Sequence, residues 1–194
     1  MAGKKKKSKA SLIVWAFLIS LALTISLTPI MRLVYPLSYI EEIEKYSETY
    51  NLDKYLVMGI ISAESGFDPS AQSHKDARGL MQVKEETAKW LSETMKIEIN
   101  AEDITDPDVN INIGCAYMRY LIDRYGGHED TAIAAYNAGP GNADKWLSDT
   151  RYSKEGKVLF KIPFYETEEY VKKVQKRREI YQKLYDTTHN TAQK

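Results

Sequence analysis

From Ser38 onwards, apolar residues recur at helical spacing along almost the whole chain, and this pattern constrains the fold more than any other feature of the sequence. Ser38 and Asp53 mark helix starts, because short polar side chains cap the first turn. Another start is marked by Asp106, which precedes a proline at the first helical position. The sequence therefore predicts an all-α domain.

The expected helices are amphipathic, and a basic run, KKVQKRRE, is predicted to form the solvated face of the last one. Two short segments, 96–100 and 157–165, have the composition of extended pieces. The expected helices cover about 38–50, 53–64, 84–95, 106–125, 129–138 and 167–185.

The N-terminus has the charge pattern of a membrane segment. Lysines at positions 4–7 and 9 precede residues 10–27, which contain no charged side chain. A spanning helix needs about 17–25 apolar residues, whereas the apolar region of a signal peptide has about 7–15. The sequence therefore predicts an uncleaved single-pass anchor in the cell membrane, with the lysines in the cytoplasm and the rest of the chain outside. A signal peptide removed on export, which would give a secreted protein, is the alternative.

Four parts follow from these patterns. They are a basic cytoplasmic tail (1–9), a transmembrane anchor and linker (10–35), a helical main domain (36–186) and a polar tail (187–194).

The charge distribution argues against nucleic acid as a partner. Residues 1–35 carry six basic and no acidic side chains, so the 21 basic and 27 acidic side chains that remain leave the main domain mildly acidic. The three histidines and the single cysteine show no metal-ligand spacing, and Cys115 lies in an apolar helical pattern that predicts burial. The sequence therefore indicates neither a metal nor a cofactor.

One apolar stripe runs directly into a glutamate. Leu56, Ile60 and Glu64 are spaced by four residues and so lie on one face of a helix, which stops at Gly66. Partial burial and the negative end of the helix both favour the neutral carboxyl form. An acid that stays protonated near neutral pH can protonate a poor leaving group. Taken alone, however, an exposed residue at a helix end is the simpler interpretation of Glu64.

Glu64 also begins the first of four motifs that follow one another along the chain. In order and spacing, the motifs resemble those of the lytic transglycosylases with a goose-type lysozyme-like catalytic domain. The resemblance covers about Ser38 to Leu184. The motifs are ESGFDPSAQS (64–73), ARGLMQV (77–83), AYNAGPGN (135–142) and ETEEYVKKV (166–174).

The resemblance implies a lysozyme-like fold and an enzyme that acts on peptidoglycan glycan strands. The family cleaves the β-1,4 bond from N-acetylmuramic acid to N-acetylglucosamine without water and leaves a 1,6-anhydromuramic acid end. Glu64 then corresponds to the single acid and base. A site with one carboxylate suits a substrate that supplies its own nucleophile, because ordinary glycosidases use two. Asp68 stands before a proline and is interpreted as a turn residue.

The resemblance also implies five substrate-binding residues. Ser73 corresponds to a serine near the muramic acid, although a loop hydroxyl is an equal alternative. Tyr136 corresponds to a tyrosine that reaches the catalytic region. Glu166 corresponds to a sugar-contacting glutamate and would also suit a helix N-terminus. The remaining two positions are Gln82 and Asn137, the latter with a partly structural role at a helix end.

The sequence departs from the family after ARGLMQV, where Lys84 and Glu85 replace the usual methionine and proline. Two other functions stay open. A hydrolytic muramidase on the same fold would need a second carboxylate in the cleft. A non-catalytic peptidoglycan-binding scaffold in an envelope assembly would not need Glu64.

Overall fold

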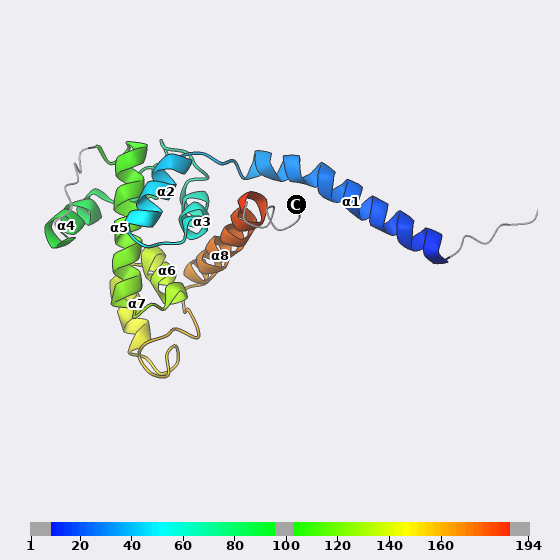
Figure 1. The fold of residues 1–194 in the computed structure, drawn as a ribbon. Coiled ribbons are helices and arrows are strands. Elements are labelled where there is room, and N and C mark those ends of the chain that lie inside the picture. Colours follow the sequence, from blue (N-terminus) through cyan, green and yellow to red (C-terminus); the bar gives the residue numbers. More distant parts are fainter. Residues whose placement is uncertain (1–8, 96–102, 187–194) are drawn as a thin grey trace, which may run out of the picture. The chain divides into compact units, whose positions relative to one another are not determined.

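A computed structural model describes residues 9–95 and 103–186, and Figure 1 shows how the helices follow one another along the chain. The helices of these residues are α1 (Lys9–Val34), α2 (Ile40–Thr49), α3 (Lys54–Glu64), α4 (Glu85–Met95), α5 (Pro107–Arg124), α6 (Glu129–Ala138), α7 (Pro140–Leu147) and α8 (Tyr165–Tyr185).

The contacts divide the chain into two units, Met1–Leu37 and Ser38–Lys194. The first unit contains α1, which covers most of the predicted anchor and linker. No helix in the described part of the chain combines the length and the apolar character that crossing a bilayer requires, so the structure does not support the predicted transmembrane anchor. The predicted tails, 1–9 and 187–194, lie outside the described residues except for Lys9.

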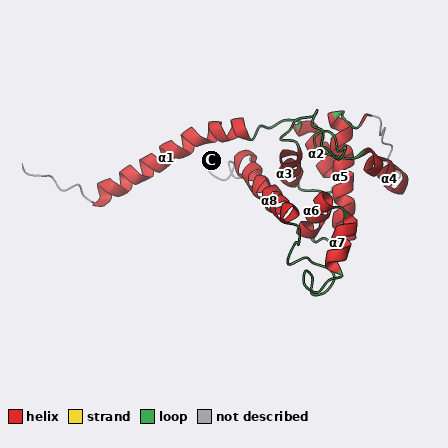
Figure 2. Ribbon diagram, turned by 180° about the vertical axis from the view of Figure 1, so that it is seen from behind, coloured by secondary structure: helices red, strands yellow, loops and turns green. Residues whose placement is uncertain are grey.

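The second unit is built around α5, which runs between α4 on one side and α2 and α3 on the other (Figures 1 and 2). Residues on several sides of α5 are buried, among them Ile111, Ile113 and Cys115. The predicted burial of Cys115 is therefore confirmed. Figure 2 shows helices and loops but no strand over the described residues, which confirms the mainly helical fold.

α3 and α8 pack closely against each other along their length. The close approach depends on Gly59, because a Cβ atom there would lie 2.8 Å from the carbonyl oxygen of Val174 on α8. α8 fixes this packing with cations: Arg177 donates to Ser62 Oγ at 2.8 Å, and Arg178 pairs with Asp53 at 2.6 Å. The prediction that the basic run is only a solvated face is therefore wrong for these residues.

The capping residues predicted from the sequence are correct for two helices and wrong for one. The side chains of Asp53 and Asp106 accept hydrogen bonds from the first turns of α3 and α5, as predicted. Ser38 was expected to cap α2, but the N-cap is Tyr39, whose backbone is left-handed and whose side chain makes no capping hydrogen bond. The left-handed backbone of Tyr39 starts the helix one residue later than the capping preference of serine predicts.

Two further differences concern the second half of the chain. Gly139, with φ of 85°, ends α6, and the proline that follows begins α7, a helix the sequence pattern did not predict. The segment 157–165, expected to be partly extended, contains no strand, because no neighbouring strand is present in the described residues to pair with it. The other such segment, 96–100, lies outside the described residues.

Candidate active site

Glu64 is the last residue of α3, and Ser65 is its C-cap. Leu56 and Ile60, on the same face of the helix, are completely or almost completely buried. The apolar stripe therefore carries the Glu64 side chain from the core to the rim of a cavity, and the negative end of the α3 dipole lies beside its carboxyl group.

The surroundings of Glu64 favour a protonated carboxyl group. Burial raises the pKa of Glu64 to about 7 from an ordinary value of 4.5. Two contacts oppose this effect: the hydroxyl of Tyr170 donates to Glu64 Oε1 at 2.6 Å, and the positive charge of Lys173 lies nearby. Because the effect of burial is larger than that of the two contacts, a large fraction of Glu64 is neutral near pH 7 and can act as a proton donor.

The two opposing groups come from α8. Tyr170 is 8% exposed, and burial together with the Glu64 charge holds its pKa well above the ordinary range, so it remains a neutral donor. Lys173 donates to the carbonyl oxygen of Ala63 at 2.8 Å and so caps the end of α3. The packing of α8 on α3 therefore positions the proton-donating group of Glu64.

The loop between α3 and α4 forms the next wall of the site. Ser65 ties the loop to the helix end, since its hydroxyl donates to the carbonyl oxygen of Leu80 at 2.8 Å. Asn110, which is fully buried in α5, accepts from the Met81 amide at 2.7 Å and donates to the carbonyl oxygen of Arg78 at 2.9 Å. Gly79 makes room for this amide, because a Cβ there would lie 2.4 Å from Asn110 Nδ2.

A third wall comes from α6. The hydroxyl of Tyr136 donates to the carbonyl oxygen of Met81 at 2.9 Å, which joins α6 to the loop between α3 and α4. Its ring lies against that of Tyr117, with the centroids 5.3 Å apart. Burial, and secondly the charge of Glu64, raise the pKa of Tyr136 well above its ordinary value, so the hydroxyl stays neutral.

These walls enclose a cavity of about 470 Å³. It is lined by all six residues that the sequence singled out, together with cations and further polar groups of α4. The six are Glu64, Ser73, Gln82, Tyr136, Asn137 and Glu166; their neighbours include Lys75, Lys84, Glu86, Thr87 and Tyr117. The six residues alone come from four parts of the chain, namely α3, the loop between α3 and α4, α6 and α8.

Ser73 and Gln82 have a structural part in the loop as well as a place on the cavity wall. Ser73 Oγ accepts from the amides of Lys75 and Ala77 at 3.2 and 3.1 Å. Gln82 has a positive φ of 47°, and its side-chain amide donates to the carbonyl oxygens of Ala71 and Gly79, both at 2.9 Å. Both side chains thus hold the loop in the shape that faces Glu64.

Asn137 and Glu166 line the cavity from the end of α6 and the start of α8. The Oδ1 atom of Asn137 accepts from the Thr167 hydroxyl at 2.8 Å, so it ties the end of α6 to the start of α8. Glu166 is exposed in the first turn of α8, as expected for an acid at a helix start. Asp68, by contrast, bonds to Ser70 within its own turn and does not line the cavity, as its interpretation as a turn residue implied.

Three positioning residues were not singled out from the sequence. Tyr170 lies in the fourth motif, four residues after Glu166, but nothing in the local pattern identifies it as the partner of Glu64, which is 106 positions away. Asn110 is a polar residue on an apolar helix face, which is a signal for a buried hydrogen-bonding role. Ser65 gave no signal beyond its place in the first motif.

Lys84, at the departure from the family pattern, lines the cavity and lies 3.4 Å from Glu86, measured from Nζ to Oε1. A lysine side chain therefore lines the cavity at this position. Within residues 9–95 and 103–186, no group of three or more His, Cys, Asp and Glu side chains could hold a metal ion.

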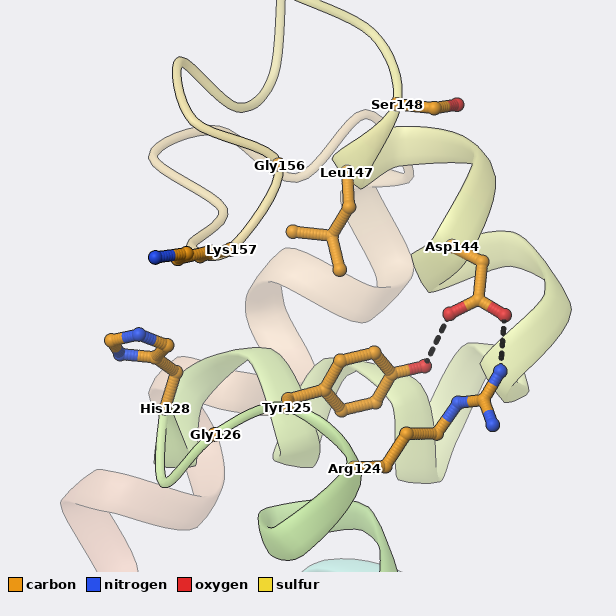
Figure 3. A pocket seen from close by; sticks show the side chains of 9 residues that line it. All are labelled: Arg124, Tyr125, Gly126, His128, Asp144, Leu147, Ser148, Gly156 and Lys157. Atoms are coloured by element: carbon orange, nitrogen blue, oxygen red, sulfur yellow. Dashed lines mark hydrogen bonds and ion pairs between the residues drawn. The ribbon is translucent and has the colours of Figure 1, made fainter.

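A larger cavity, of about 810 Å³, lies at the ends of α5 and α7 (Figure 3). The carboxylate of Asp144 there pairs with Arg124 at 2.7 Å and accepts from the Tyr125 hydroxyl at 3.1 Å. None of the six residues lines this cavity, and its carboxylate is already neutralised by an ion pair. Its size alone does not make it the better candidate site.

The chain resembles known proteins over the region that forms this site. Residues 41–159 match the family described as Transglycosylase SLT domain. The soluble lytic murein transglycosylase of Escherichia coli K12 is 33% identical over 143 residues, which are 72% of this chain and 22% of that protein. A transglycosylase of Enterobacteria phage PRD1 is 39% identical over 126 residues, 65% of this chain and 43% of the phage protein.

The fold has solved relatives too. The lytic transglycosylase Slt of Pseudomonas aeruginosa, solved as an inactive glutamate-to-glutamine mutant, matches with a TM-score of 0.70 and 32% identity. The match covers 79% of this chain and 25% of that one. The membrane-bound lytic murein transglycosylase C of Edwardsiella ictaluri is 33% identical over 58% of this chain. The chain thus spans less than half the length of each of these relatives.

Proposed function

Because the chain belongs to the family of transglycosylase SLT domains, we propose that it is a peptidoglycan lytic transglycosylase with Glu64 as its single acid and base. The observation that carries this proposal is the environment of Glu64. Its carboxyl group lies in the cavity at the end of an apolar stripe, and burial raises its pKa to about 7. The carboxyl group also accepts a hydrogen bond from the hydroxyl of Tyr170.

The first step of the proposed reaction needs the protonated form of Glu64. Its carboxyl group donates the proton to the oxygen that links N-acetylmuramic acid to N-acetylglucosamine, and the C1–O bond breaks. The acetamido oxygen of the muramic acid stabilises the positive centre left at C1. Glu64 is now a carboxylate, and the hydrogen bond from Tyr170 stabilises this charge.

In the second step, the carboxylate takes the proton from the C6 hydroxyl of the same sugar while that oxygen bonds to C1. The product is a 1,6-anhydromuramic acid end, and Glu64 regains its proton. The nucleophile belongs to the substrate, so the attack is intramolecular and has a high effective concentration. No second carboxylate is required, in contrast to hydrolytic glycosidases.

The other cavity residues are proposed to orient the sugar. Ser73 and Gln82, on the loop wall, would contact the muramic acid, and Asn137 and Glu166, at the end of α6 and the start of α8, would hold hydroxyl or acetamido groups. Tyr136 would supply an apolar ring face beside the catalytic group. The substrate places this reaction on the extracytoplasmic side of the cell membrane.

The products of a peptidoglycan digest test the proposal. Mass spectrometry is expected to show glycan ends lighter by one water than hydrolytic ends, and Glu64→Gln is expected to lose them. Hydrated ends would instead indicate a muramidase, with Glu86 or Glu166 of the cavity wall as the second carboxylate to examine. Binding without cleavage by the unmodified chain would support a non-catalytic scaffold.

A further inference from the structure

The loop between α7 and α8 exposes large apolar side chains. Val158 and Phe160 expose 44% and 57% of their surface, and Phe164 and Tyr165, where the loop meets α8, are exposed too. Figures 1 and 2 both show that this loop projects beyond the end of α7. Exposed apolar side chains that gather on a projecting loop indicate an interaction surface.

Lysines are interspersed with these apolar side chains. Residues 154–161 have the sequence KEGKVLFK, which contains three lysines and a single acid, Glu155. Lys154, Lys157 and Lys161 are exposed, and in the part of the chain that the structure describes none of them forms an ion pair. We call residues 154–161 the basic–apolar loop. It is positively charged, although the main domain as a whole is acidic.

The basic–apolar loop is fixed at its base. The amide of Phe160 donates to the carbonyl oxygen of Tyr152 at 3.0 Å, and the amide of Leu159 donates to Thr131 Oγ1 at 3.3 Å. Gly156, with φ of 68°, allows the turn between the two lysine-bearing ends. Because the backbone is fixed before binding, less conformational entropy is lost when the loop meets a partner.

A hollow of about 460 Å³ lies on the loop itself. It is lined by Lys154, Glu155, Val158 and Phe160. The Nζ atom of Lys154 lies 6.0 Å from the centroid of the Phe160 ring, so a positive charge stands beside an exposed apolar surface. An anionic phospholipid offers the complementary arrangement, because its negative headgroup is joined to apolar acyl chains.

The combination of lysines with apolar side chains distinguishes between classes of partner. Lysine is depleted in protein–protein interfaces, whereas aromatic residues and arginine are enriched there. A soluble polyanion such as a nucleic acid would attract the lysines, but it would leave Val158 and Phe160 in water. At a bilayer surface both kinds of side chain contribute, because apolar groups insert at the level of the headgroups and lysines attract anionic lipids.

We propose that the basic–apolar loop docks the second unit on the surface of a bilayer that contains anionic phospholipids. Val158 and Phe160 insert at the level of the headgroups, and the three lysines bind the negative headgroups around them. The contact is made by the second unit and does not involve α1. It goes beyond the proposed function, because it does not depend on the reaction that Glu64 catalyses.

A fluorescent label on a single cysteine tests the contact in the full chain. The label is attached to Val158→Cys, and Glu93→Cys, at an exposed position of α4, is the matched control. Cys115 is the only native cysteine and is buried, so it does not compete for the label. The vesicles contain phosphatidylcholine, with or without phosphatidylglycerol, and a nitroxide-labelled phospholipid that quenches a label in contact with the bilayer.

We expect quenching at position 158 to be at least about threefold stronger than at position 93 in the anionic vesicles, and weak at both positions in the neutral ones. Residues 1–37 are the same in both labelled proteins, so membrane binding through them cannot produce this difference. Equal quenching at the two positions, or equal quenching at position 158 in both kinds of vesicle, would overturn the proposal. Absence of quenching at position 158 would also overturn it and would favour a soluble partner for the loop.

Two triple variants of the labelled Val158→Cys chain test the part of the lysines. The first combines Lys154→Gln, Lys157→Gln and Lys161→Gln. The control combines Lys172→Gln, Lys176→Gln and Lys183→Gln, at exposed positions of α8, and changes the net charge equally. The first variant is expected to need at least about tenfold more anionic lipid for half-maximal quenching, and the control to need nearly the same amount as the parent. An equal loss in both variants would overturn a contact specific to the loop.

Discussion

The protonated state of Glu64 that the proposed reaction requires has a cost in stability. Burial raises its pKa to about 7 in the folded chain, whereas the unfolded chain has the ordinary value of 4.5. Between these values the folded state binds a proton that the unfolded state releases. The free energy of unfolding therefore falls as the pH rises from about 4.5 to about 7, and the full penalty is present above pH 7.

Glu64→Gln removes this penalty because glutamine does not titrate. We expect the variant to unfold with about the same free energy as the unmodified chain near pH 4.5, and to be more stable by about 2–3 kcal/mol at pH 8. Urea unfolding at both pH values measures the difference. The exposed Glu93→Gln is the control, expected to change stability by less than about 0.5 kcal/mol. A stability difference independent of pH would show that burial does not raise this pKa.

Tyr170→Phe tests the neighbour of Glu64. The hydrogen bond from Tyr170 favours the carboxylate form, so its loss is expected to raise the pKa of Glu64 further. The decline of kcat/KM on the alkaline side should then move to higher pH. Tyr136→Phe is the comparison, because that hydroxyl bonds to the Met81 carbonyl oxygen instead. A decline that stays in place in Tyr170→Phe would show that this hydrogen bond does not tune the acid.

Several residue-level features could be predicted from the sequence, and others could not. The spacing of Leu56, Ile60 and Glu64 correctly placed the glutamate at the end of a buried stripe, because helical periodicity is local information. The partners of Glu64 on α8 depend on contacts between residues more than a hundred positions apart, and their identity cannot be derived from local patterns.

At the scale of elements, the site depends on the close packing of α3 and α8. Gly59→Ala would gain about 1 kcal/mol of helix propensity, but its Cβ would lie 2.8 Å and 3.2 Å from backbone atoms of Val174 and Arg178. Backbone cannot move aside cheaply, so we expect a net loss of about 1–3 kcal/mol in the free energy of unfolding. Activity should fall as well, because α8 carries Tyr170.

Gly141→Ala, in α7, is the matched control, since no atom lies within 4 Å of the added Cβ. Thermal unfolding of both variants measures the difference, and Gly141→Ala is expected to be neutral or slightly stabilising. Equal stability of Gly59→Ala and the unmodified chain would show that α3 and α8 can separate without cost.

The elements themselves were largely predictable, with informative exceptions. Helices with aspartate caps began where expected, because the cap is a local hydrogen bond. α7 was missed since its eight residues follow directly after the glycine that ends α6. The cations of α8 were misjudged because a charge run says nothing about whether neighbouring helices offer partners.

At the scale of the whole molecule, the unit formed by Ser38–Lys194 contains the candidate site and the core that supports it. A chain restricted to 38–194 is expected to unfold cooperatively with nearly the same Tm as the full chain, and to cleave soluble glycan strands at a similar rate. Calorimetry and product analysis measure both. Loss of cooperative unfolding would mean that residues 1–37 are required for the fold of the second unit.

The proposed reaction requires that Glu64 is a carboxylic acid that keeps its proton near neutral pH. The most direct measurement is an NMR titration of the side-chain carboxyl carbons in protein labelled at glutamate, with Glu64→Gln to identify the signal. We expect a midpoint of about 7 for Glu64. A midpoint near the ordinary value of 4.5 would mean that the group is ionised at neutral pH, and would contradict its role as the proton donor.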